Sequence, residues 1–367
     1  ALCALPEPQR GGSLELLRHY LPSERNEDFI LAVGCLLAAL MPKGPYPLLE
    51  ITGDANSGKS TFARFLRRLV DPHMLELSHL PGEARDFFIA AENMWILVFD
   101  NVSALNQQFS DILCQIATTG GVVARKLYTN RDVVVIFVAR PIILVGISSV
   151  ADAPDLRDRV IRLEFRELGK DKVKTMVALE TTFQVDAPKI LGALCDAVSA
   201  ALRHYSEAEA FLQQALKTLP VSPPRMLDVI QWVTAAELGD ALPWKPGEFL
   251  RAYVQNRMET AGDVLNDLVA SAIVKFMENK PSWEGSVKDL LEEIERTGAF
   301  PLVATKTFPK EPRVLGKVLR RLAPELRRVA GIDVEWKRTE SARLVSLSRQ
   351  GVPEDVSPSL FQGDAPI

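Results

Sequence analysis

The chain has 367 residues, of which 47% are hydrophobic and 25% charged, with a formal net charge of −4. This length predicts two or three domains with a full-sized core, and the composition is that of an ordinary soluble protein. The slight acidity argues against a uniformly basic coat for nucleic acid, so any basic surface must be local. The four cysteines and four histidines show no metal-ligand spacing, which favours reduced thiols in a cytoplasmic protein.

The N-terminal part contains the most apolar run of the chain. Residues 29–41 (FILAVGCLLAALM) fall short of the roughly 20 residues that span a bilayer, so we expect a buried helix over Asn26–Leu40 and no membrane partner. The start, ALCALPEPQRGG, lacks the basic and then apolar pattern of a signal peptide. We expect residues 1–28 to form a loose lead-in with a short helix at Leu14–Tyr20. No Met opens the sequence, which leaves open that the chain is processed or comes from a longer protein.

A nine-residue run, GDANSGKST, fits the phosphate-loop pattern G-x-x-x-x-G-K-[ST]. We expect an apolar strand before it over Pro47–Thr52 and an amphipathic helix after it over Thr61–Val70. Glycines let the loop curl so that its N–H groups point at phosphate oxygens, and the helix adds the positive end of its dipole. Lys59 should reach the β- and γ-phosphates, and the Ser60 hydroxyl should ligate Mg²⁺ of bound ATP. The expected nucleotide-binding residues of this loop are Gly53, Asp54, Ala55, Asn56, Ser57, Gly58, Lys59, Ser60 and Thr61.

The next predicted strand, Trp95–Phe99, ends in an acid, Asp100. A buried strand would hold this carboxylate beside Ser60, so that the two coordinate Mg²⁺ directly or through water. Asn101 follows, where many ATPases place a glutamate, and an amide can orient a water but cannot accept its proton. Either another carboxylate does that work, with Glu92 and Asp111 as candidates, or hydrolysis is slow. A simple turn-capping role for Asn101 is the alternative.

Residues 118–141 are predicted to form a β-hairpin that precedes the next core strand. Arg125, Lys126 and Arg131 make this hairpin cationic, which suits a pore loop that grips the phosphate backbone of single-stranded DNA. A solvated hairpin with ordinary surface charges is the alternative. The two expected strands and their turn are Val122–Thr129, Val133–Ala139 and Asn130–Asp132.

Two further core strands are expected at Ile142–Gly146 and Val160–Phe165, which predicts a parallel sheet covered on both faces by helices. The segment before the last strand, PDLRDR, contains Arg157 and Arg159. The segment is similar to one in ring ATPases, where an arginine reaches the γ-phosphate bound by a neighbouring subunit, because a guanidinium matches phosphate oxygens, and this similarity favours Arg159 as the finger. A local Arg–Asp surface pair is the alternative. The expected catalytic residues are Lys59, Asp100, Asn101 and Arg159.

After Phe165 the apolar spacing becomes helical, which predicts an α-helical lid. Arg225 stands at the start of one of its helices, where the helix dipole disfavours a cation, so we expect it to face an anion. Its place is similar to that of the lid sensor arginine of ring ATPases, which implies a contact with the nucleotide. An ordinary solvated arginine is the alternative. The expected helices are Lys189–Arg203, Glu207–Leu216, Arg225–Leu238 and Pro246–Arg257.

A basic C-terminal unit is predicted to be a winged helix. Residues 301–350 contain twelve Lys and Arg against five Asp and Glu. Ser286 and Asp289 form a capping box, and Pro324 should kink or shorten the last helix. A basic helix before a hairpin addresses duplex DNA in winged helices, and a protein-docking domain is the alternative. The expected helices are Asp263–Asn279, Ser286–Arg296 and Pro312–Val329, and the expected strands are Asp333–Lys337 and Arg343–Leu347. The expected contacts with DNA are Arg313, Lys317, Arg320 and Arg321.

Taken together, these motifs resemble the AAA+ ATPases that carry a β-hairpin before the sensor-1 strand. Within them the chain is most similar to the superfamily 3 helicases and the primase-associated helicases of phages and mobile elements. It is especially similar to a bacterial group of ATP-binding proteins, and the segments that carry this resemblance are GPYPLLEITGDANSGKST, WILVFDN, TTGGVVARKLYT and DLRDR. It covers roughly residues 24–260, and the winged helix more loosely. The chain departs from its relatives in the sensor-1 strand, where they commonly have Asn and this chain has Val145, with Ser148 as the nearest polar residue.

The resemblance implies an α/β fold with an AAA+ P-loop core and an ATP-dependent DNA helicase or translocase in phage or mobile-element replication. It implies a homo-oligomeric ring, with a hexamer favoured, and a primase or N-terminal partner domain. Two alternatives stay open: a regulatory or defence ATPase switch with low turnover, and an initiator or loader that remodels DNA. The expected parts are the lead-in 1–28, the ATPase core 29–168, the lid 169–260, the winged helix 263–350 and a disordered tail 351–367.

Overall fold

A computed structural model divides the chain into two compact units, residues 1–257 and 258–367. Among the residues that it describes, every helix is too short or too polar to cross a bilayer. The described residues are 2–118, 121–125, 133–151, 153–169, 173–217, 224–265, 268–296, 309, 311–338 and 343–349.

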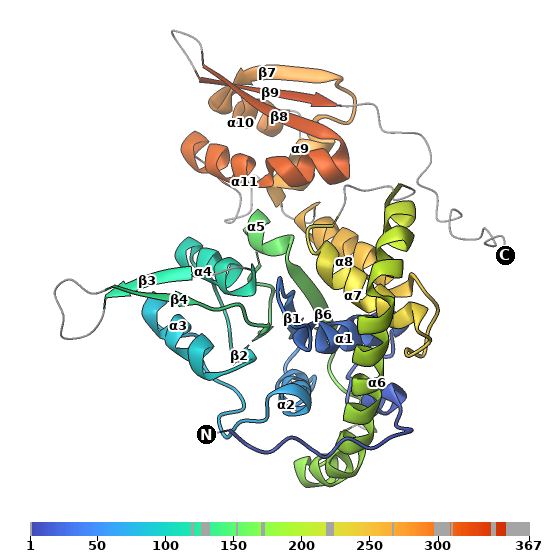
Figure 1. The fold of residues 1–367 in the computed structure, drawn as a ribbon. Coiled ribbons are helices and arrows are strands. Elements are labelled where there is room, and N and C mark those ends of the chain that lie inside the picture. Colours follow the sequence, from blue (N-terminus) through green and yellow to red (C-terminus); the bar gives the residue numbers. More distant parts are fainter. Residues whose placement is uncertain are drawn as a thin grey trace. The chain divides into compact units, whose positions relative to one another are not determined.

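A four-stranded parallel sheet forms the centre of the first unit (Figure 1). The strands lie in the order β2-β5-β1-β6, and all three pairings between neighbours are parallel. This confirms the predicted α/β class and parallel sheet, with differences of two residues or fewer at the strand ends. The strands are β1 (Leu48–Gly53), β2 (Leu97–Phe99), β5 (Ile142–Val145) and β6 (Val160–Phe165).

Successive residues of these strands enter two separate hydrophobic cores, one on each face of the sheet, as the alternation of a strand requires. Leu49 and Ile51 contribute to the α2-side core, and Leu48 contributes to the α4-side core. The predicted helical cover on both faces is therefore confirmed. The α2-side core is closed by η1 (Leu14–His19), α1 (Asn26–Ala39), α2 (Lys59–Val70), α6 (Met176–Lys217), α7 (Leu227–Leu238) and the first part of α8 (Glu248–Leu265). The α4-side core is closed by α3 (Ala84–Asn93), α4 (Gln107–Thr118) and α5 (Pro154–Arg157).

The predicted hairpin is present as an antiparallel pair, β3 (Gly121–Arg125) and β4 (Val133–Phe137). In Figure 1 the pair extends away from the sheet on the side of α3 and α4. Arg125 is the last residue of β3. Lys126 and Arg131, the other two predicted DNA contacts of this hairpin, lie outside the described residues.

Helix α6 runs unbroken through Pro188, although the sequence predicts a first helix that begins at Lys189 and a second that begins at Glu207. The turn before Pro188 is held by contacts with distant parts of the chain. The Phe183 ring stacks on Phe65, with ring centroids 4.3 Å apart. Asp186 accepts a hydrogen bond of 2.9 Å from the Tyr20 hydroxyl. These tertiary contacts offset the backbone hydrogen bond that proline removes.

The N-terminal segment is packed against α6 and is not the loose lead-in that the sequence predicts. The Gln9 N–H donates to the Pro188 carbonyl at 2.9 Å. A Cβ atom on Gly192 would lie 1.8 Å from the Gln9 carbonyl oxygen, and one on Gly12 would lie 1.8 Å from the Lys189 carbonyl oxygen. Two glycines thus allow the two backbones to approach more closely than any other residue permits.

Replacing Gly192 by alanine tests this packing, because the sign of the change in the free energy of unfolding depends on whether Gln9 lies against the helix. At an unobstructed helix position the change stabilises by about 1 kcal/mol. Here the new Cβ must displace Gln9, so we expect the free energy of unfolding to fall by about 1–3 kcal/mol. Ser199→Ala, at an exposed position of the same helix, is the control and should change the stability by less than about 0.5 kcal/mol. Denaturant unfolding measures both, and a stabilised Gly192→Ala protein would show that the segment is not packed there.

In its described residues the second unit combines the end of α8 and three further helices with a three-stranded antiparallel sheet in the order β7-β9-β8. The predicted capping box is confirmed, because the Asp289 N–H donates to the Ser286 hydroxyl at 3.2 Å and the Ser286 N–H donates to the Asp289 carboxylate at 2.9 Å. The elements are α9 (Leu268–Phe276), β7 (Ser282–Ser286), α10 (Val287–Arg296), α11 (Pro312–Ala330), β8 (Ile332–Arg338) and β9 (Arg343–Arg349).

Two features of this unit differ from the sequence prediction. The sequence does not predict strand β7, because SWEGS lacks the apolar alternation of a strand, and in the structure this segment pairs with β9. Helix α11 is not shortened by Pro324 but continues to Ala330. Pro324 is exposed, whereas Leu322 and Leu326 on either side are buried and tie both halves of the helix to one core.

Candidate nucleotide-binding site

The glycine-rich loop joins the carboxyl end of β1 to the first turn of α2. Its backbone enters the left-handed region three times, at Gly53 (φ 133°), Asn56 (φ 60°) and Gly58 (φ 80°). A Cβ atom on Gly53 would lie 1.8 Å from the carbonyl oxygen of Phe165, so glycine is required there. The curled loop ends at the N-terminus of α2, where free N–H groups and the helix dipole favour an anion.

The Lys59 ammonium is bound by oxygens of the loop itself. It donates to the Gly53 carbonyl at 3.0 Å and to the Ser57 hydroxyl at 3.1 Å, and also to the Asp54 carbonyl. Burial lowers the pKa of Lys59, while the nearby carboxylates of Asp54 and Asp100 act in the opposite direction. A partly desolvated cation surrounded by loop carbonyls is well placed to exchange these partners for phosphate oxygens.

Ser60 and Asp100 meet at the same end of the sheet. The Ser60 hydroxyl, in the first turn of α2, donates to the Asp100 carboxylate at 3.1 Å. The backbone of the next residue supports the carboxylate, since the Asn101 N–H donates to it at 2.8 Å. The sequence predicts that Asp100 lies beside Ser60, and in the structure the two side chains are in contact.

This donor set fits Mg²⁺ that arrives with a nucleotide. No cluster of three or more His, Cys, Asp or Glu side chains able to hold a metal ion occurs within the described ranges. A site with one hydroxyl and one carboxylate would need phosphate oxygens and water to complete six oxygen ligands, which is how Mg²⁺ is usually held beside a triphosphate. Ser60 and Asp100 are therefore suited to Mg²⁺ with a bound triphosphate and not to an isolated ion.

Among the described residues, neither candidate carboxylate for activating water forms a hydrogen bond with Lys59, Ser60, Asp100 or Asn101. Glu92 is at the end of α3, and the neighbouring Ala91 and Met94 carbonyls accept from Arg140, next to the amino end of β5. Asp111 is in the second turn of α4, where Gln107 donates to its carboxylate at 2.9 Å. Asn101 itself is exposed and has a left-handed backbone, with φ 58°.

The position at which the resemblance predicts a sensor-1 residue, Val145, is buried in the structure. Val145 is 1% exposed and belongs to the α2-side core, so it cannot contact a phosphate. Ser148, three residues later, is exposed beyond the carboxyl end of β5. If a side chain of this segment senses the nucleotide, Ser148 is the available one.

Arg159 lies at the opposite end of the sheet from the loop. Its carbonyl accepts from the N–H of Leu48, the first residue of β1, whereas the loop follows the last residue, Gly53. The length of β1 separates the two ends by about 17 Å. The Arg159 side chain is largely buried, its Nη1 donates to the Asp155 carbonyl, and its Nε has no hydrogen-bond partner among the described residues.

Arg225 does not reach the phosphate loop of its own chain. Its Nη1 donates to the Asp155 carboxylate at 2.9 Å, and Arg159 lies 3.9 Å from the same carboxylate. Asp155 thus brings the two predicted nucleotide-contacting arginines together at the amino end of the sheet. Sequence reasoning missed Asp155, because no local pattern links residue 155 to residue 225.

One face of α11 in the second unit is basic. Arg313, Lys317 and Arg320 are exposed and follow the spacing of a single helix face. The guanidinium carbon of Arg320 lies 4.3 Å from the centre of the Trp336 ring on β8, which orients this side chain along the sheet. For Arg321, the fourth predicted DNA contact, the structure describes only the backbone position in α11.

The first unit is thus an α/β domain with a central parallel sheet and a glycine-rich loop at its carboxyl edge. The chain belongs to the family of actinomycete integrative conjugative element replication proteins, whose family model matches residues 16–216. The model of the RepA C-terminal domain from the same elements matches residues 269–359. The expected role in replication of a mobile element is therefore confirmed.

Comparison with individual proteins adds distant structural similarity. No curated protein matches the chain. The A form apo structure of the NrS-1 C-terminal region is similar with 11% identity and a TM-score of 0.42, over 94% of this chain and 78% of that one. The X-ray structure of JCV helicase is similar with 15% identity and a TM-score of 0.31, over 63% of this chain and 64% of that one.

Proposed function

We propose that this replication protein is an ATP-dependent DNA motor, a helicase or translocase. The observation that carries the proposal is the meeting of Lys59, Ser60 and Asp100 at one end of the sheet, with the Ser60 hydroxyl 3.1 Å from the Asp100 carboxylate. A helix N-terminus, a lysine and an oxygen pair of this kind together suit a magnesium-bound triphosphate. The family assignment supports DNA as the substrate of the motor, because the family consists of replication proteins.

In this proposal Lys59 binds the β- and γ-phosphates, and the loop N–H groups bind the remaining phosphate oxygens. Ser60 and Asp100 hold Mg²⁺, which neutralises charge on the phosphates when it is bound. Asn101 lies next to Asp100 and can orient a water through its amide. The chain thus supplies binding, positioning and a water-orienting group, but no carboxylate directly after Asp100.

The position of Arg159 favours a ring of identical subunits. An arginine at the far end of the sheet cannot serve the loop of its own chain, but it can reach a loop that a neighbour presents to that end. A head-to-tail contact of this kind closes into a ring when its rotation permits, and we propose a hexamer. Each nucleotide would then lie between two subunits.

Two parts of the chain are proposed to contact DNA. The β3–β4 hairpin would grip single-stranded DNA through Arg125, Lys126 and Arg131. In the second unit, the order α9-β7-α10-α11-β8-β9 with a β7-β9-β8 sheet is what a winged helix requires, which supports α11 as its recognition helix. Duplex DNA would lie against Arg313, Lys317, Arg320 and Arg321.

Removing two charges from α11 tests the duplex contact. For Arg313→Ala combined with Lys317→Ala we expect weaker duplex binding and a salt dependence reduced by about two ion contacts, because each lost phosphate contact lowers the slope by about one. Lys288→Ala on α10 is the control, because Lys288 is exposed but pairs with Glu292 at 3.7 Å. Fluorescence anisotropy at several salt concentrations measures both, and an unchanged slope in the double variant would rule out α11 as the contact.

ATP hydrolysis with and without DNA tests the motor proposal. We expect single-stranded DNA to stimulate turnover, because a motor couples its nucleotide cycle to its track. A protein that binds ATP but is stimulated by no DNA would contradict a motor. Strand displacement on forked DNA then separates a helicase from an initiator or loader that remodels duplex without unwinding it.

A low-turnover switch is the second candidate function, and the nucleotide site itself favours it. Asn101 cannot accept a proton and Val145 is buried. Among the described residues, neither Glu92 nor Asp111 forms a hydrogen bond with Ser60 or Asp100. A switch would bind ATP tightly and hydrolyse it slowly, with or without DNA. Single-turnover measurements separate slow chemistry from slow product release and so distinguish this case from a motor.

A further inference from the structure

The stretch between α2 and α3 places a histidine beside Asp100. Ser78 forms an isolated parallel bridge with Phe99, the last residue of β2. The Ser78 N–H donates to the Val98 carbonyl at 3.0 Å, and the Asp100 N–H donates to the Ser78 carbonyl at 2.8 Å. In this register the residue after Ser78, His79, is level with Asp100 on the adjacent extended segment, at a backbone separation of about 4.8 Å.

The His79 side chain belongs to the same side of the sheet as the phosphate loop. Leu77 packs against the α2-side core and Leu80 against the α4-side core. Because successive side chains of an extended segment alternate, His79 shares the side of Leu77. Asp100 is on that side too, since it accepts the hydrogen bond from Ser60 of α2.

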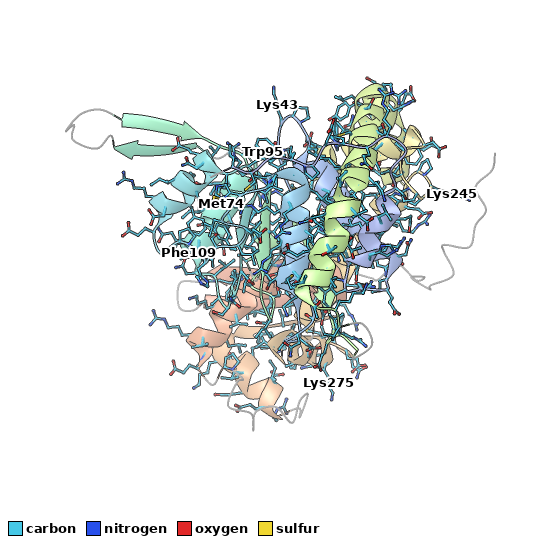
Figure 2. The ribbon with its side chains drawn as sticks, turned by 90° about the horizontal axis from the view of Figure 1, so that it is seen from below. Lys43, Met74, Trp95, Phe109, Lys245 and Lys275 are labelled. Carbon is cyan, nitrogen blue, oxygen red and sulfur yellow. The ribbon has the colours of Figure 1, made fainter. Side chains whose placement is uncertain are left out.

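The imidazole of His79 is available for a ligand. His79 is exposed, and no hydrogen bond or ion pair of its side chain occurs among the residues that the structure describes. The other histidine of this stretch is different, because His73 Nδ1 accepts from the Leu75 N–H at 3.0 Å. Met74, labelled in Figure 2, is 75% exposed, so the stretch lies at the surface before it reaches the sheet.

We propose that His79 orients the water that attacks the γ-phosphate of ATP, in the place of the carboxylate that is missing after Asp100. The role rests on the proposed ATPase function. In the reaction the water oxygen bonds to the γ-phosphorus while the bond to the β–γ bridging oxygen breaks, giving ADP, phosphate and a proton released to solvent. A neutral imidazole offers one hydrogen-bond acceptor and one donor, and so can hold this water together with the Asn101 amide.

The test compares His79→Ala and His79→Gln with the wild-type protein. For His79→Ala we expect kcat to fall by about tenfold to a hundredfold, because a misplaced water loses the orientation that the reaction needs. KM and the affinity for ATP should stay within about twofold, because the ring does not bind the triphosphate itself. His79→Gln keeps a donor and an acceptor and should recover part of the lost kcat. His204→Ala, on α6, is the control for the loss of a histidine elsewhere.

Each outcome separates this role from the motor proposal. An unchanged kcat in His79→Ala beside an active wild-type protein overturns the role of His79 and leaves the ATPase standing. Loss of ATP affinity in step with kcat, or no recovery in His79→Gln, indicates a binding or structural role and also overturns the proposal. A wild-type protein with no turnover, with or without DNA, contradicts the ATPase function and the role of His79 with it.

Discussion

Lys59→Ala is expected to lower ATP hydrolysis by about a hundredfold to a thousandfold, the range for losing one hydrogen-bond donor at a site where negative charge develops. Affinity for ATP should fall by about tenfold to a hundredfold, since hydrogen bonds to charged groups contribute about 1.5–3 kcal/mol. We expect both losses because the Lys59 ammonium lies at the phosphate loop, where it donates to the carbonyls of Gly53 and Asp54. Steady-state ATPase and nucleotide-binding assays measure the two effects.

Two further variants test whether the loss of hydrolysis is specific to the nucleotide site. Lys43→Ala removes an exposed lysine at the periphery of the same unit, labelled in Figure 2, and should leave hydrolysis unchanged. Asp100→Asn should keep the fold and raise the Mg²⁺ concentration needed for half-maximal activity, because an amide is a weaker ligand for Mg²⁺ than a carboxylate. Wild-type hydrolysis in Lys59→Ala would place the nucleotide site elsewhere.

The features that could be predicted from sequence are those whose cause lies within a few neighbouring residues. The phosphate loop needs left-handed backbone at Gly53 and Gly58, and glycine supplies it. The capping box over Ser286 and Asp289 is a local exchange of hydrogen bonds. The contact between Asp100 and Ser60 joins more distant residues, but it too could be predicted, because β1 and β2, although separated by β5, run parallel in one sheet and end at the same edge.

The features that could not be predicted depend on partners far along the chain. Helix α6 continues through Pro188 because Phe183 and Asp186 are held by residues of η1 and α2 or next to them. The N-terminal segment is fixed by a close approach to Gly192, which nothing in its own sequence indicates. The Ser78 bridge beside β2 is one residue long and carries no apolar alternation, so His79 had no reason to be singled out.

Arg159 and Arg225 combine both situations. The sequence favours Arg159 and Arg225 as separate contacts with a nucleotide, each from its own local context. The structure joins them through Asp155, whose carboxylate accepts from Arg225 at 2.9 Å while Arg159 donates to the carbonyl of the same residue. One acidic residue therefore holds both guanidinium groups at the end of the sheet that faces away from the loop of their own chain.

Arg159→Ala is expected to abolish hydrolysis while ATP binding stays intact, because an arginine finger typically contributes about a thousandfold or more to turnover and little to ground-state affinity. The guanidinium is largely buried beside Asp155, so it must exchange this partner for a phosphate oxygen to act. Arg159→Lys should not restore activity, since an ammonium lacks the planar fork that a guanidinium presents to phosphate. Retained hydrolysis in Arg159→Ala would remove it as the finger.

Mixing two inactive proteins decides whether Arg159 acts between subunits. Lys59→Ala lacks a working loop and keeps its finger, whereas Arg159→Ala lacks the finger and keeps its loop. If each site joins the loop of one subunit to the finger of the next, co-assembly in equal amounts should restore about a quarter of the interfaces. Recovery also excludes misfolding of either protein, because each then contributes a working half-site. If Arg159 served its own chain, no mixture would regain activity, and the proposed ring would lose the observation that supports it.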